Sequence, residues 1–193
     1  MHTPSLFALQ NSTPQSIVFD KAGDAFVSSA DSGDIVKYSA AGTVLGTVNT
    51  SSRANWIDLS ADQKTLYFTT GGDSVSRIDF STGTVLSDFG SGYGGPNGVS
   101  AADRLLSDGG LLLADGTDIK RFDSSGNVVQ TYGDSFADAG TFFSLNLDPD
   151  GKSFWSGVQS DGLRYKFDIA SGAFEQTIDT GAGAFSLFGV SVF

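Results

Sequence analysis

PQSIVFDKAGDAFVSSADSGDIVKYSAAGTVLGTV, residues 14–48, contains the pattern that decides the fold. Four short apolar runs, at about 16–20, 24–29, 34–38 and 43–48, are separated by stretches rich in Asp, Ser and Gly. Short apolar runs between such turn residues predict β-strands joined by hairpins, and helical periodicity is absent. The stretch therefore predicts a four-stranded antiparallel sheet.

The same pattern returns three times along the chain. The later repeats begin at Ala54, Pro96 and Phe142, which gives a period of about 40 to 46 residues. Turn sequences recur in register, as do a basic residue and a large apolar residue at the end of each third strand. These pairs are Lys37–Tyr38, Arg77–Ile78, Arg121–Phe122 and Lys166–Phe167. A four-stranded antiparallel unit repeated at this spacing predicts an all-β protein, a β-propeller.

The repeat also predicts the domain organisation. We expect a single β-propeller domain over residues 1–193, with blades at about 14–50, 54–90, 96–133 and 142–180. The segment 186–193 aligns with the first strands and the segment 4–10 with the fourth strands, so together they predict a partial fifth blade. Because its middle strands are missing, three alternatives stay open: a small ring with a reduced closing blade, a homo-oligomer that completes the blade, or a fragment of a longer propeller.

Composition excludes several classes of function. The chain has 22 acidic and 11 basic residues, a net charge of −11, and no basic stretch that could bind phosphates, so we expect no nucleic-acid partner. No apolar run is long enough for a membrane span, and we expect no membrane partner. With no Cys and only His2, Ser-His-Asp and Cys-His catalysis are disfavoured. The low Lys content predicts an extracellular or periplasmic protein, although residues 1–15 do not read as a signal peptide.

Two motifs resemble known propellers. PQSIVFDKAGDAFVSSADSGDIVKYSAAG, from Pro14, is similar to an NHL repeat. PNGVSAADRLLSDGGLLLAD, from Pro96, and ANWIDLSADQKTLYFTT, from Ala54, resemble the motif of the SMP-30/gluconolactonase propellers. The resemblance covers about residues 14–193 and implies an axial Ca²⁺ held by residues that open the innermost strands.

The resemblance implies particular site residues. It makes Asn97 and Asn55 metal ligands and places Gln15, Phe143 and Phe188 at the equivalent points of the other blades. This set contains three amides and two phenyl rings but no carboxylate, whereas Ca²⁺ prefers six to eight oxygens that usually include carboxylates.

The one candidate catalytic residue is Asp58. It follows Asn55 by three residues, and an odd offset along a strand points the two side chains to opposite faces. By the same alignment, Asn146, Ser100 and Ser191 share its register.

The loops suggest a second kind of site. Tyr93, Phe143 and Phe188, with loop aspartates such as Asp115, predict an acidic funnel lined by aromatic rings at the face where the inner strands begin. Such a funnel suits a small molecule or a protein segment. Two functions follow: a binding or interaction module, which we favour, and a Ca²⁺-dependent hydrolase of lactones, esters or phosphotriesters. Ca²⁺ is the only cofactor that the resemblance implies.

Overall fold

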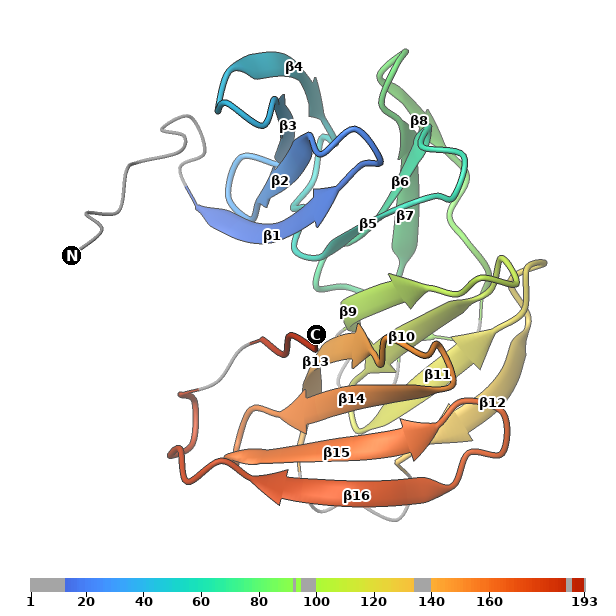
Figure 1. The fold of residues 1–193 in the computed structure, drawn as a ribbon. Helices are drawn as coiled ribbons and strands as arrows, with labels where there is room; N and C mark the ends of the chain where they lie inside the picture. Colours follow the sequence, from blue (N-terminus) through green and yellow to red (C-terminus); the bar gives the residue numbers. More distant parts are fainter. Residues whose placement is uncertain (1–12, 92, 95–99, 134–139, 187–188, 193) are drawn as a thin grey trace. The chain divides into compact units, whose positions relative to one another are not determined.

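The protein folds entirely from β-strands over the residues that its structure describes. A computed structural model describes residues 13–91, 93–94, 100–133, 140–186 and 189–192. In these ranges the strands form four antiparallel sheets of four strands (Figure 1). No described helix is long and apolar enough to cross a membrane. The fold is an all-β propeller fold of four-stranded blades, which confirms the prediction from the repeat.

Strands pair in sequence order within every blade. The first and second blades contain β1 (Pro14–Phe19), β2 (Ala25–Ser29), β3 (Asp34–Tyr38), β4 (Val44–Asn49), β5 (Ile57–Leu59), β6 (Thr65–Thr69), β7 (Val75–Asp79) and β8 (Thr84–Leu86). The third and fourth contain β9 (Ser100–Leu105), β10 (Leu111–Asp115), β11 (Asp118–Phe122), β12 (Val128–Tyr132), β13 (Phe142–Leu147), β14 (Ser153–Val158), β15 (Leu163–Asp168) and β16 (Phe174–Asp179). Each of the four strands predicted in the first repeat overlaps its observed counterpart.

Hairpin turns form at the Asp- and Gly-rich stretches. The carbonyl of Asp20 accepts a hydrogen bond from Gly23 N at 3.0 Å, and its Oδ1 accepts from Ala22 N and Asp24 N at 2.9 and 3.0 Å. Gly23 has a φ of 85°, a left-handed conformation that glycine adopts without steric cost. The aspartate side chain therefore satisfies turn amides that have no strand partner.

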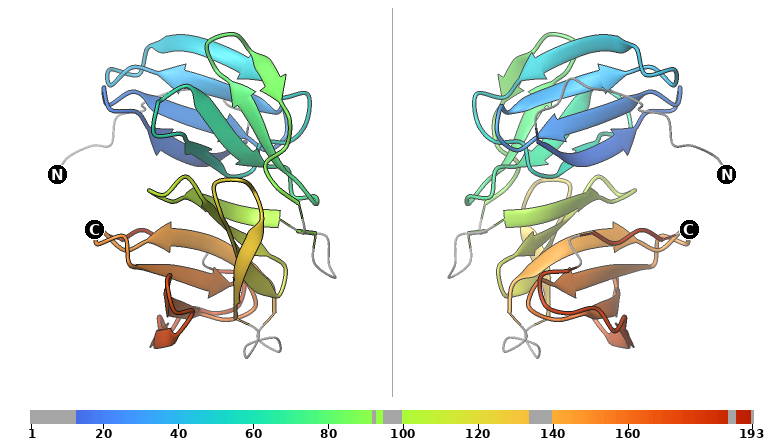
Figure 2. Two further views of the ribbon diagram at one scale, coloured as in Figure 1. Left: turned by 90° about the vertical axis from the view of Figure 1, so that its right-hand side faces the viewer. Right: turned by 90° about the vertical axis from the view of Figure 1, so that its left-hand side faces the viewer.

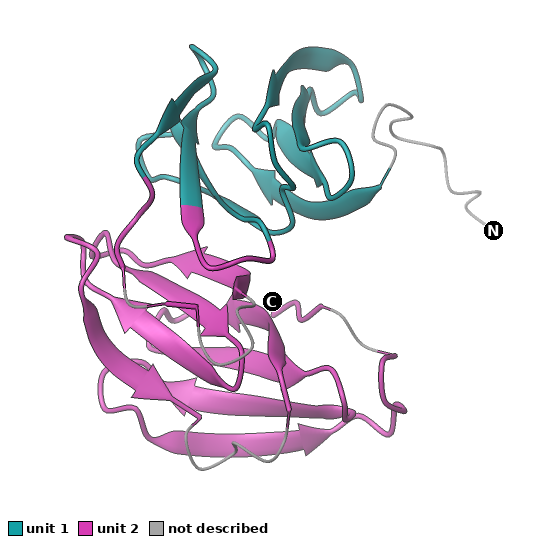
Figure 3. Cartoon of the chain, turned by 180° about the vertical axis from the view of Figure 1, so that it is seen from behind, with its two compact units in different colours: residues 1–70, 76–87 teal, residues 71–75, 88–193 magenta. Residues whose placement is uncertain are grey.

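The chain divides into two compact units (Figure 3). Unit 1 comprises Met1–Thr70 and Ser76–Ser87, and unit 2 comprises Gly71–Val75 and Asp88–Phe193. The first two blades therefore belong to unit 1, apart from the stretch 71–75, and the last two blades belong to unit 2. The predicted single domain over residues 1–193 stays a prediction.

The core of unit 1 lies between its two blades. It contains Phe26, Ile35 and Val48 from the first blade and Ala54, Ile57, Leu59, Leu66, Phe68 and Ile78 from the second. The ring of Phe80 packs edge-on against Phe26, with 4.9 Å between the ring centroids. Buried apolar area stabilises by about 25 cal/mol per Å², so the packing of these side chains between the two blades stabilises the unit.

Aromatic rings pack together in the core of unit 2. Phe154 and Phe167 stack with 5.4 Å between their centroids, and Tyr132 meets Phe154 edge-on at 5.0 Å. The Tyr132 hydroxyl donates to the Ile169 carbonyl at 2.7 Å. Burial raises the pKa of Tyr132 to about 12, so this donor stays protonated. The bond joins the last strand of the third blade to a turn of the fourth.

Exposure differs between the second and fourth strands. All five residues of β10 are buried, whereas all six residues of β16 are exposed. β10 lies between two strands of its sheet, whereas β16 is the last strand of its sheet, where solvent reaches its side chains.

Basic residues on the third strands pair with acids in the first hairpin turns. Lys37 Nζ lies 2.8 Å from Asp20 Oδ2 and 5.1 Å from the centroid of the Phe26 ring. In the fourth blade, Lys166 pairs with Asp148 and lies over Trp155. In the first and fourth blades, the recurring base therefore ties the third strand to the first hairpin turn and to an aromatic ring.

The predicted closing blade is described only in part. Segment 4–10 lies outside the described residues. Among residues 186–193, the described residues are in no strand. Residues 189–192 nevertheless lie beside β13 (Figures 1 and 2), where the Val190 carbonyl accepts a hydrogen bond from Asn146 Nδ2 at 3.3 Å. The fifth blade stays a prediction.

Two isoleucines at equivalent positions test the packing between blades. Ile57 in β5 is fully buried, whereas Ile17, at the same register position in β1, is 50% exposed. We expect Ile57→Ala to lower the free energy of unfolding by about 3 kcal/mol, because it leaves a cavity. The matched Ile17→Ala should lower it by about 1 kcal/mol or less. Urea unfolding measures both, and equal losses would show that Ile17 is covered in solution.

A double-mutant cycle tests the turn ion pair. Bonding to Lys37 lowers the pKa of Asp20, and bonding to Asp20 raises the pKa of Lys37. An acid whose pKa falls on folding stabilises the fold above its unfolded pKa, about 4, and loses this contribution as the pH drops through its folded pKa.

We therefore expect Asp20→Asn and Lys37→Met to couple by about 1 kcal/mol at pH 7, and the coupling to be lost as the pH falls through the lowered pKa of Asp20. Denaturant unfolding of the cycle at pH 7 and at a series of acidic pH values checks this. A coupling that persists at the lowest of these pH values would contradict the assignment to an ion pair.

Candidate functional site

The strand-entry positions predicted as a site are only partly described. Asn97 and Phe188 lie outside the described residues. Gln15 is exposed on β1, and Asn55 and Phe143 are half-buried. The roles of these residues as ligands stay predictions.

The register of the third blade corrects the sequence alignment. The last ladder pair before the first hairpin turn is Leu59–Leu66 in the second blade and Leu105–Leu111 in the third. Counting back four residues from Leu59 gives Asn55, and from Leu105 it gives Ala101. Asn97 is therefore not equivalent to Asn55, because the third blade has four more residues between Pro96 and its turn than the alignment assumed.

The same register changes the equivalents of Asp58. Asp58 pairs with Tyr67, and the matching residues of the other blades are Val18, Arg104 and Asn146. The equivalence to Ser100 was wrong, whereas that to Asn146 is confirmed. Asp58 Oδ1 accepts a hydrogen bond from the Leu59 amide at 2.8 Å, and Asn146 Oδ1 accepts from Leu147 N at 3.0 Å. Both side chains thus make the same local contact with their own strand.

Asn55 takes part in a polar contact between the two blades of unit 1. Its carbonyl accepts a hydrogen bond from Ser28 Oγ at 3.2 Å. Two residues further along, Ile57 N donates to Ser16 Oγ at 3.3 Å. Serines of the first blade therefore bond the main chain of the inner strand of the second blade.

The described residues do not fit the Ca²⁺ site that the resemblance implies. Each of the four blades has one residue at the register position of Asn55. These residues supply amides from Gln15 and Asn55, a methyl group from Ala101 and a phenyl ring from Phe143. Within the described ranges there is no group of three or more His, Cys, Asp or Glu side chains that could hold a metal ion. Neutral amides with apolar neighbours make a poor set for a cation that prefers carboxylates.

Two residues of the predicted funnel are engaged within unit 2. The ring of Tyr93 packs edge-on against the buried Phe122, with 5.7 Å between centroids. Asp115 is fully buried, where its carboxylate accepts hydrogen bonds from Gly94 N and from the Lys120 ammonium. Burial lowers the pKa of Lys120, but its bonds to Asp115 and Asp118 outweigh this effect and leave the pKa raised. Asp115 is thus part of a buried ion pair instead of an exposed acidic rim.

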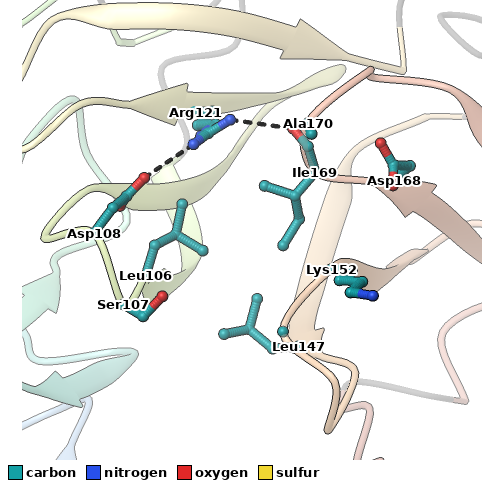
Figure 4. A pocket seen from close by; sticks show the side chains of 10 residues that line it. Leu106, Ser107, Asp108, Arg121, Leu147, Lys152, Asp168, Ile169 and Ala170 are labelled. Carbon is teal, nitrogen blue, oxygen red and sulfur yellow. Dashed lines mark hydrogen bonds and ion pairs between the residues drawn. The ribbon is translucent and has the colours of Figure 1, made fainter.

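A pocket lies at the opposite ends of the strands in unit 2. Its volume is about 400 Å³ (Figure 4). We call it the turn-side pocket, and it is lined by Leu106, Ser107, Asp108, Arg121, Leu147, Gly151, Lys152, Asp168, Ile169 and Ala170. These residues come from the β9–β10, β13–β14 and β15–β16 turns, from β11, and from the last residues of β13 and β15. The side chains of Leu106, Leu147 and Ile169 converge on the space between the two blades.

Arg121 forms the back of the turn-side pocket. Its Nη2 lies 2.9 Å from Asp108 Oδ2, and its Nη1 donates to the Ile169 carbonyl at 3.3 Å. In β10 it pairs with Leu112, where the first and fourth blades have Phe26 and Trp155. Without a ring to lie over, the guanidinium instead connects the turns of two adjacent blades.

Both acids of the pocket are negatively charged at neutral pH. Hydrogen bonds from Gly110 N and from Arg121 lower the pKa of Asp108. Hydrogen bonds from the Ser171 hydroxyl and amide lower the pKa of Asp168. Among the described residues, no ion pair is formed by Lys152. The lining therefore has two charges of each sign around three aliphatic side chains.

The turn-side pocket was missed in the sequence because its residues read as ordinary turns. Asp168 opens a hairpin like its equivalents, and Arg121 matches the repeated base. The one available signal is Leu112, an aliphatic residue where other blades have an aromatic ring. That signal becomes informative only once the register is known.

The comparisons show the fold alone. No protein-family model and no curated protein matches the chain. Among solved structures, the chain is similar to Kuenenia stuttgartiensis hydrazine synthase, with a TM-score of 0.68 and 18% sequence identity over 88% of this chain and 50% of that chain. The chain thus spans about half the length of this neighbour. In total, 1419 chains of solved structures match, and a fold so widely used does not indicate an activity.

Proposed function

We propose that this protein is a β-propeller binding module and that its turn-side pocket takes a small molecule with an aliphatic body and a zwitterionic end. The observation that carries the proposal is the convergence of Leu106, Leu147 and Ile169 into one pocket with charged residues around it. Ligand sites are typically apolar cavities with a few polar groups that fix orientation. A volume of about 400 Å³ lies in the usual range for such sites, about 300 to 1,000 Å³.

The charges favour a zwitterion over a simple anion. The formal charge of the pocket lining is zero, whereas the chain as a whole has a net charge of −11. A strongly negative protein repels free anions over long distances. A ligand with both charges avoids this penalty, because its carboxylate suits Lys152 while its ammonium suits Asp168.

The acidic, aromatic funnel at the strand-entry face is a less favoured location for binding. Tyr93 and Asp115, two of its expected components, already make contacts inside unit 2. A protein segment bound at that face would contact residues such as Phe143, which is half-buried.

The alternative function is a Ca²⁺-dependent hydrolase of the SMP-30 type, which rests on the Pro-Asn-Gly resemblance. The register weighs against it, since Ala101 and Phe143 stand where further oxygen ligands are needed. Asn97 is the one residue of the motif that could still support it.

Calorimetric titration tests the binding proposal. We expect leucine to bind the intact chain more tightly than 4-methylpentanoate, which lacks the ammonium, or 3-methylbutylamine, which lacks the carboxylate. An affinity of about 0.1 to 1 mM is reasonable for so small a ligand. Ala170→Trp should abolish binding, because Ala170 is an exposed residue of the pocket wall and the indole would fill the space.

The matched control is Ser81→Trp, at the equivalent exposed position of the β7–β8 turn in unit 1, which should bind leucine like the unmodified chain. If none of the three compounds binds, the proposed ligand class is wrong. If both Trp variants bind equally well, the site is wrong.

Thermal unfolding with and without a chelator tests the hydrolase alternative. A ligand that binds only the folded state raises the melting temperature. We expect neither EDTA nor millimolar Ca²⁺ to shift the melting temperature, because the register supplies no carboxylate set. A Ca²⁺-dependent rise that Asn97→Ala removes, together with turnover of a lactone or phosphotriester, would instead establish the hydrolase.

A further inference from the structure

In three of the four blades, the base of the third strand lies over an aromatic ring of the second strand. The distances from the cation to the ring centroid are 5.1 Å for Lys37 and Phe26, 5.8 Å for Arg77 and Tyr67, and 5.6 Å for Lys166 and Trp155. A cation within about 6 Å of a ring centroid is attracted by the quadrupole of the ring. Each of these blades therefore contains a cation–π pair.

The third blade has the base but lacks the ring. Arg121 pairs across the ladder with Leu112, whereas Lys37 pairs with Phe26 at the equivalent place in the first blade. Among the residues that the structure describes, Arg121 makes no cation–π contact. Its hydrogen bonds to Asp108 and to the Ile169 carbonyl lie in the plane of the guanidinium, so neither of them covers a face.

The third blade also lacks the acid that holds the base in the first blade. Asp20 and Leu106 are equivalent, because the carbonyl of each accepts a hydrogen bond from a turn glycine at 3.0 Å. Asp20 pairs with Lys37, whereas Leu106 has no carboxylate, and Arg121 pairs with Asp108 in the turn instead. The guanidinium thus lies in the wall of the turn-side pocket (Figure 4).

The equivalent place in unit 1 contains a phenyl ring. Phe80 and Ile169 are equivalent, because the amide of each donates to a lysine carbonyl in the first hairpin turn of its blade, that of Lys64 at 3.1 Å and that of Lys152 at 2.8 Å. The Phe80 ring meets Phe26 edge-on, with 4.9 Å between centroids. In unit 2 both members of this ring pair are replaced by aliphatic side chains, and a pocket remains.

On the basis of the proposed function, we propose that the ligand of the turn-side pocket carries an aromatic ring, which lies on the guanidinium of Arg121 and supplies the cation–π pair that the third blade lacks. The ligand class is then an arylalkyl zwitterion. Its carbon chain contacts the three aliphatic side chains, and its charged end lies between Lys152 and Asp168. The volume of about 400 Å³ has room for the ring, since pockets of about 300 to 1,000 Å³ take drug-sized ligands.

Calorimetric titration of the intact chain with leucine, phenylalanine and pentafluorophenylalanine tests the ring subsite. The two aromatic ligands have similar shapes, but the fluorines reverse the charge distribution of the ring and remove its attraction for a cation. We expect phenylalanine to bind about three- to tenfold more tightly than pentafluorophenylalanine, and more tightly than leucine.

Arg121→Met and Arg77→Met are the matched variants. Each removes the base of a third strand, but Arg77 lies in unit 1 over Tyr67 and does not line the pocket. Arg121→Met should reduce the ratio of the two aromatic affinities to about one, whereas Arg77→Met should leave that ratio unchanged. The ratio is the readout because Arg121 also holds Asp108, and its loss can change the affinity of every ligand. Should Arg121→Met fail to fold, the ligand series on the unmodified chain decides alone.

The outcomes separate the ring subsite from the proposed function. If leucine binds while phenylalanine binds no more tightly than pentafluorophenylalanine, the ring subsite is wrong and the proposed function stands. An unchanged ratio in a folded Arg121→Met variant would also overturn the ring subsite, because the ring would then lie elsewhere. If none of the three compounds binds, the proposed function is wrong and the ring subsite with it.

Discussion

The burial of one blade face against the next is the contact on which each unit of this protein depends. A single four-stranded sheet has two faces, and the second strand of each blade is largely buried. In unit 1 the apolar face made by Phe26, Ile35 and Val48 finds its complement in the second blade. In unit 2 the aromatic rings of Tyr132, Phe154 and Phe167 fill the corresponding space. Turns, ion pairs and polar contacts are arranged around these two interfaces.

The same constraint explains where sites arise. Large side chains of adjacent blades meet in the core of each unit, and in unit 2 a pocket remains beside the turns, where the chain reverses. The turn-side pocket lies at such a place, and Arg121 bridges it because Leu112 offers no ring. Residues 189–192 lie beside β13, where the Val190 carbonyl accepts a hydrogen bond from Asn146, while the buried Ser144 Oγ has no hydrogen-bond partner among the described residues.

Much of the fold could be predicted from the sequence, and little of the site. The strands of the first repeat were predicted to within two residues, because Asp- and Gly-rich turns act locally and recur at a fixed period. The alignment of Asn97 with Asn55 was wrong, because the third blade has four more residues between Pro96 and its first hairpin turn than the alignment assumed. Asp115 was taken for an exposed acid because its ion pair with Lys120 depends on burial, which no local pattern reveals.

By itself, the sequence determined the repeat, the turn positions, the all-β class and the base at the end of each third strand. These features depend on residues close together in the chain, so local physics is sufficient to predict them. Only the tertiary structure decided which face of each blade is covered, which residues share a register position, and that Leu106, Leu147 and Ile169 meet in one pocket. Those properties arise from contacts between strands that are distant in sequence, where a shift of a few residues changes every neighbour.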